Sequence, residues 1–164
     1  MMAEKSKVQK ALEEAIRFEV DGREFFLQAA DKAETYLAKS IFKVLAEEEL
    51  GHIQKVKEVH RRCLSSEKEI FLPPVTEKSR LENIFQQAKR ETDPKVLMKT
   101  GELEAVRLAL QLEIKGHDFY NRLAQEATGE FEKAFYHQLT QEESVHFSVL
   151  RQMEEALVNA TSFG

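Results

Sequence analysis

The sequence predicts an all-α fold in which four long helices pack side by side as a bundle. Only six Gly and three Pro occur in 164 residues, so few residues interrupt helices. Four stretches carry apolar residues at the three- and four-residue spacing of an amphipathic helix. The composition, 42% hydrophobic and 32% charged, is typical of a globular protein with a charged surface. The length suits one domain, and we expect a single domain over 1–164.

The four apolar stripes define two helical hairpins, at about 5–65 and 101–160. We expect helices at about 5–33, 35–65, 101–127 and 130–160. Short turns near Glu34 and Thr128 join the helices of each hairpin, and such turns make antiparallel neighbours. Helices of this length do not fold alone, so the two hairpins must pack together.

Residues 66–100 connect the hairpins and have a different composition. The segment holds Pro73-Pro74, and a helix-start pattern at Thr76 then predicts a short extra helix at about 77–91. Because neither hairpin can bury its stripe without the other, we interpret the segment as a crossover along the bundle. A linker between two domains is the alternative.

The two hairpins repeat one pattern. A shift of 94 residues aligns 11–53 with the second half of the chain without a gap. Identical pairs include Glu19/Glu113, Gly22/Gly116, Glu48/Glu142, Glu49/Glu143 and His52/His146. The repeat predicts a bundle with an approximate twofold axis.

Six polar residues interrupt the apolar stripes. They are Glu19, Glu49, His52, Glu113, Glu143 and His146. In each Glu-x-x-His pair the two side chains lie on one helix face, one turn apart. Glu19 and Glu49 are 30 residues apart with their midpoint at the first predicted turn, and Glu113 and Glu143 repeat this separation. All four carboxylates should therefore lie at one level of the bundle.

Four buried carboxylates need compensating charge, because burying unpaired charges costs many kcal/mol. Two divalent cations would balance them, and two neutral imidazoles would complete the ligand set. Mixed carboxylate and imidazole ligands suit iron or manganese and tolerate zinc or cobalt. Glu48 and Glu142 also repeat and could be ligands in place of Glu49 and Glu143. A bundle with semi-buried polar residues paired to Lys or Arg would need no metal.

At these residues the chain resembles the rubrerythrin-like branch of the ferritin superfamily, along nearly its whole length. The resemblance implies a ferritin-like bundle with two Fe ions, for which Mn or Zn could substitute. It implies that Glu49 and Glu143 bridge the ions, that Glu19 and Glu113 are terminal ligands, and that His52 and His146 bind one ion each. It also implies redox chemistry on H2O2 or O2, as in a peroxidase, and a homodimer. A ferroxidase or iron-storage subunit, and a non-catalytic helical module with structural zinc, are the alternatives.

Two features depart from the family pattern. Rubrerythrins with a C-terminal rubredoxin domain carry two CxxC pairs, whereas this chain has one cysteine, Cys63. Electrons would therefore come from an external donor such as a rubredoxin-type protein. In addition, Gly116, mirrored by Gly22, stands where such proteins have a second Glu on the third helix. This glycine pair either opens space beside the metals or allows close helix packing.

Other features limit the class of function. Tyr120 lies two turns after Glu113, so it could donate a hydrogen bond to a ligand or simply pack in the core. The net charge of −5, without a basic patch, argues against nucleic-acid binding. No uncharged run approaches the length that spans a bilayer, and we expect a cytoplasmic protein with no membrane partner.

Overall fold

The computed structural model describes residues 6–65 and 100–162. These ranges hold four helices and no strand: α1 (Lys7–Lys32), α2 (Tyr36–Ser65), α4 (Thr100–Glu126) and α5 (Glu130–Ser162). The predicted all-α four-helix bundle is thereby confirmed, and the helix ends differ from the expected ones by only a few residues. The short helix expected at 77–91 lies outside the described residues. None of the described helices is long and apolar enough to cross a membrane.

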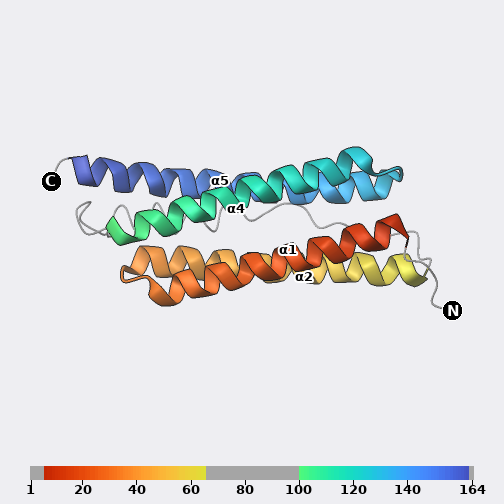
Figure 1. The fold of residues 1–164 in the computed structure, drawn as a ribbon, viewed down its shortest axis with the longest axis horizontal. Helices are drawn as coiled ribbons and strands as arrows, with labels where there is room; N and C mark the ends of the chain where they lie inside the picture. The colour runs from red at the N-terminus through yellow and green to blue at the C-terminus, as the bar shows by residue number, and fades with distance from the viewer. Residues whose placement is uncertain (1–5, 66–99, 163–164) are drawn as a thin grey trace.

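The hairpins are stacked with their long axes side by side (Figure 1). Helix α1 packs along α2, α4 packs along α5, and α1 faces α4 across the bundle. The turn between α1 and α2 lies at the opposite end of the bundle from the turn between α4 and α5. This arrangement brings the middle of every helix to the middle of the bundle.

Local sequence determines where α1 begins. The Ser6 side chain accepts a hydrogen bond from the Gln9 backbone N–H, and the Gln9 side chain accepts one from the Ser6 N–H, both at 3.1 Å. This capping box satisfies two donors that the first turn of a helix leaves free. It fixes the start of α1 about three turns before Glu19.

The turn between α1 and α2 is held by a residue of the second hairpin. Glu102, near the start of α4, accepts hydrogen bonds from the backbone N–H groups of Glu34 and Thr35, at 3.0 and 3.1 Å. The Thr35 hydroxyl donates a third to the same carboxylate at 2.7 Å. The carboxylate therefore ties this turn to the other hairpin.

The apolar core has two parts. One cluster lies toward the α1–α2 turn and includes Phe26, Phe42 and Met153. The other lies toward the α4–α5 turn and includes Leu12 and Phe135. Because Glu19 lies between Leu12 and Phe26 along α1, the polar residues of the stripes form a layer between the two clusters.

Candidate metal centre

The structure brings all six sequence-predicted ligand residues into the polar layer, and each helix contributes to it. None of the six is more than 3% exposed. The reason is helical geometry, since each residue lies on the apolar stripe that its helix buries. That these residues bind metal stays a prediction, but their placement is what the prediction requires.

The six side chains form two overlapping groups of four. Glu19, Glu49, His52 and Glu143 each offer one ligand atom, and these atoms lie within 4.8 Å of one another. The same holds for a second group, which is Glu49, Glu113, Glu143 and His146. Glu49 and Glu143 belong to both groups, as residues that bridge two ions must.

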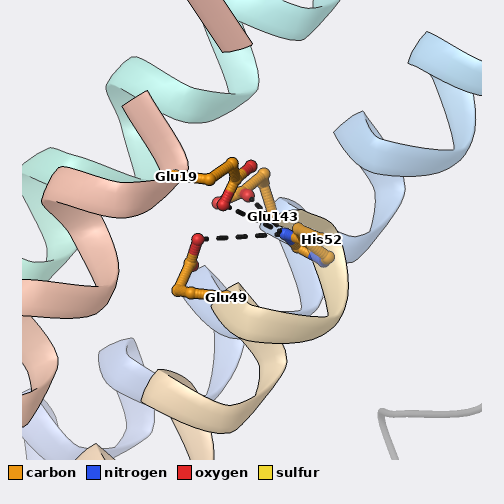
Figure 2. A group of neighbouring side chains, drawn as sticks. All are labelled: Glu19, Glu49, His52 and Glu143. Atoms are coloured by element: carbon orange, nitrogen blue, oxygen red, sulfur yellow. Dashed lines mark ion pairs between the residues drawn. The ribbon is translucent and has the colours of Figure 1, made fainter. Parts of the chain in front are cut away.

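Both imidazoles present their Nδ1 atoms to the carboxylates. His52 Nδ1 lies 3.4 Å from Glu19 Oε2 and 3.3 Å from Glu143 Oε1. His146 Nδ1 lies 3.5 Å from Glu113 Oε2. Figure 2 shows the side chains of the first group pointing toward one another. Nδ1 is thus the nitrogen that each histidine can offer to a cation.

Several of these atoms are buried without a hydrogen-bond partner. They are Glu19 Oε2, Glu113 Oε2, Glu143 Oε1, His52 Nδ1 and His146 Nδ1. Leaving a buried polar atom unpaired costs roughly 1–3 kcal/mol, and more for a charged group. Two divalent cations would give every one of them a partner. The donor set therefore fits a di-metal site.

Without metal, the carboxylates compete for protons. Burial raises the pKa of Glu113 well above its usual value, and the neighbouring charge of Glu143 raises it further. Burial also raises the pKa of Glu19. Burial opposes the charged form of Glu143 as well, but the neighbouring Glu113 and His52 outweigh it and lower its pKa to about 2. Without metal, Glu113 therefore holds a proton more readily than Glu143, and metal binding would release such a proton.

The outer nitrogen of His52 is held by the opposite hairpin. His52 Nε2 lies 2.5 Å from Glu142 Oε2, and Lys55 Nζ lies 2.8 Å from Glu142 Oε1. Burial would raise the pKa of Glu142, but His52 and Lys55 together lower it. A carboxylate at Nε2 fixes the ring and leaves Nδ1 facing the cluster.

This contact gives Glu142 a place outside the two ligand groups. Glu48, its repeat partner, is also buried and also lies outside both groups. The geometry therefore favours Glu49 and Glu143 over these neighbours as ligands. The sequence did not predict that Glu142 contacts His52. The repetition of Glu48 and Glu142 indicated only that these two residues have a role.

Tyr120 donates a hydrogen bond to a predicted ligand residue, which is one of the two roles expected from its position. Its buried hydroxyl donates to Glu19 Oε1 on α1. Burial raises its pKa well above the usual value, and the Glu19 charge raises it further, so the phenol keeps its proton. Its repeat partner Phe26 instead stacks on Phe42, with ring centroids 6.4 Å apart. The two halves of the cluster thus have different surroundings.

The glycine pair allows close packing against the shared carboxylates. A Cβ atom at Gly116 would lie 3.0 Å from Glu143 Oε2 and 3.1 Å from Phe18 Cε1. At Gly22 the nearest atom would be Glu49 Oε2, at an ordinary 3.6 Å. Close approach, one of the two readings of this pair, therefore accounts for Gly116.

A helical bundle with a buried layer of four carboxylates and two imidazoles defines the class of di-metal carboxylate proteins. The Rubrerythrin family model matches residues 10–154, and the chain belongs to that family. Among solved structures, the chain is similar to "Hypothetical Protein Pfu-1136390-001 From Pyrococcus furiosus". The identity is 22% over 93% of this chain and 91% of that one, with a TM-score of 0.66, which supports the fold alone. No curated protein matches the chain significantly.

Proposed function

We propose that the protein is a di-iron redox protein that acts on H2O2 or O2, with a rubrerythrin-like peroxidase role. The observation that carries the proposal is the sharing of Glu49 and Glu143 between two buried groups of four ligand residues. Shared carboxylates hold two ions close enough to act on one small molecule. Family membership supports the same class of chemistry.

Bound iron would supply one-electron steps between its +2 and +3 states. Neighbouring residues hold and orient the side chains that would bind the iron. The Tyr120 hydroxyl occupies Glu19 Oε1, which leaves Oε2 free to face the cluster. Glu142 and Lys55 fix the ring of His52 from outside. The apolar clusters on either side of the polar layer keep bulk water away from it.

The electrons must come from elsewhere if the reaction is to repeat. Cys63 is the single cysteine of the chain, so one chain alone cannot form a CxxC pair or a Cys-ligated iron site. We propose an external donor such as a rubredoxin-type protein. A homodimer and a cytoplasmic location stay predictions from the resemblance and the composition.

Gly116 favours a second candidate, a ferroxidase or iron-storage subunit. With glycine at this position, each group has the same donors: one terminal Glu, one His and the two shared Glu. The second carboxylate of rubrerythrins that exchanges with a histidine during the peroxidase cycle is missing here. A site without that exchange could still oxidise ferrous iron with O2.

Metal analysis and rapid mixing test the proposal. The purified protein should bind about two irons per chain, as a site with two overlapping ligand groups requires. The oxidised form should absorb in the near ultraviolet and bleach with a reductant. Faster recolouring by H2O2 than by O2 would support the peroxidase, and mineral loading far beyond two irons would support storage. A single redox-inert zinc would contradict both.

A further inference from the structure

A pocket of about 230 Å³ opens beside one half of the cluster. It lies between α4 and α5 and is lined by Glu113, Ile114, His117, Ser144 and Phe147. Glu113 is also a member of the second ligand group, and its Oε2 is buried without a hydrogen-bond partner. The wall of the pocket therefore includes a residue of the second ligand group.

Two side chains in the wall of the pocket are smaller than their repeat partners. Ser144 lies between Glu143 and His146, and its repeat partner on α2 is the larger Leu50. His117 likewise corresponds to the longer Arg23 on α1. The Ser144 hydroxyl donates to the Thr140 carbonyl of its own helix at 3.1 Å, which keeps it against the helix. The second hairpin thus carries smaller side chains than the first at these two positions.

We propose that this pocket is the route by which divalent metal ions reach and leave the cluster; the inference rests on the proposed di-metal centre. Every ligand residue is buried, so an ion needs a path through the bundle. A carboxylate and an imidazole in the wall suit a divalent cation that sheds its water stepwise. At about 30 Å³ per water, the volume admits an ion with part of its hydration shell.

Cobalt(II) binding to the metal-free full-length protein tests the route. Stopped-flow absorbance would follow association, and a chelator would follow release. Ser144→Leu introduces into α5 the leucine that α2 has at the equivalent position, Leu50. This variant should slow both rates by roughly tenfold. Because a barrier on the path acts equally in both directions, the dissociation constant should stay unchanged. Ser144→Ala removes the hydroxyl without filling the pocket and should keep the wild-type rates.

A second pair of variants guards against local misfolding. Ile114→Trp narrows the pocket at its rim, and Val20→Trp is the matched control. The two residues are repeat partners and each is 46% exposed. Slowing in Ile114→Trp but not in Val20→Trp is the expected result.

The outcomes separate this inference from the proposed function. Wild-type rates in both Ser144→Leu and Ile114→Trp would overturn the route while leaving the di-metal centre intact. A larger dissociation constant with an unchanged association rate would also overturn the route. The substituted residue would then affect the binding of the ion and not its access. Failure of the wild-type protein to bind cobalt at all would instead contradict the proposed function.

Discussion

At the scale of single residues, the shared carboxylates have the largest consequence. Glu143 belongs to both ligand groups, whereas Glu113 belongs to one. Glu143→Ala should therefore remove both ions, and Glu113→Ala should remove mainly one. Metal content per folded chain, measured by elemental analysis, checks this. Retention of one ion at full occupancy in Glu143→Ala would contradict the bridging role.

The glycine pair offers a matched comparison. A methyl group at Gly116 would press on Glu143, so Gly116→Ala should weaken metal binding by roughly 10-fold to 100-fold. At Gly22 the added methyl group has ordinary contacts, so Gly22→Ala should bind metal normally and stabilise the fold by about 0.5–1 kcal/mol. Metal titration and urea unfolding measure the two effects. Equal metal affinity in both variants would show that Gly116 does not position Glu143.

The sequence was sufficient to predict which six residues meet, because equal spacing from each turn puts them at one level. It was not sufficient to predict what holds them. Glu142 lies four residues from His146 along its helix, yet its carboxylate contacts His52 on the opposite hairpin. Likewise, the partner of Tyr120 lies on α1, 101 residues away. Such contacts depend on how the hairpins are packed against each other, and helical periodicity carries no information about that.

At the scale of helices and turns, Glu102 ties the α1–α2 turn to α4. Glu102→Ala would leave the backbone N–H groups of Glu34 and Thr35 without this acceptor and should destabilise the protein by roughly 1–3 kcal/mol. Urea unfolding at constant metal concentration measures the change. Glu104→Ala, at an exposed position of the same helix, is the control and should stay within about 0.5 kcal/mol of wild type. A similar loss in both would argue against the tie.

The helix positions themselves followed from the sequence because few residues interrupt the apolar stripes. The carboxylate tie at the turn did not follow, since the repeat partner of Glu102 is the apolar Val8. The repeat holds best near the cluster and fails at the ends of the bundle. There, each hairpin meets different surroundings.

At the scale of the whole molecule, metal binding should contribute to stability. Burying four carboxylates at one level is unfavourable without cations, and ions that bind only the folded chain stabilise it by mass action. Adding metal to 100 times its dissociation constant should raise the free energy of unfolding by about 2.7 kcal/mol for each ion that binds. Thermal unfolding at increasing metal concentration checks this. A melting temperature that does not change with metal concentration would contradict this. It would mean that protonation of the carboxylates is enough to stabilise the cluster.

Each group of ligands takes three residues from one hairpin and one from the other. The second hairpin contributes Glu143 to the first group, and the first hairpin contributes Glu49 to the second group. A pair of bound ions would then cross-link the two hairpins. If a protease cut the chain between the hairpins, the apolar clusters would still hold the two fragments together. Bound metal should then strengthen their association, and a chelator should weaken it.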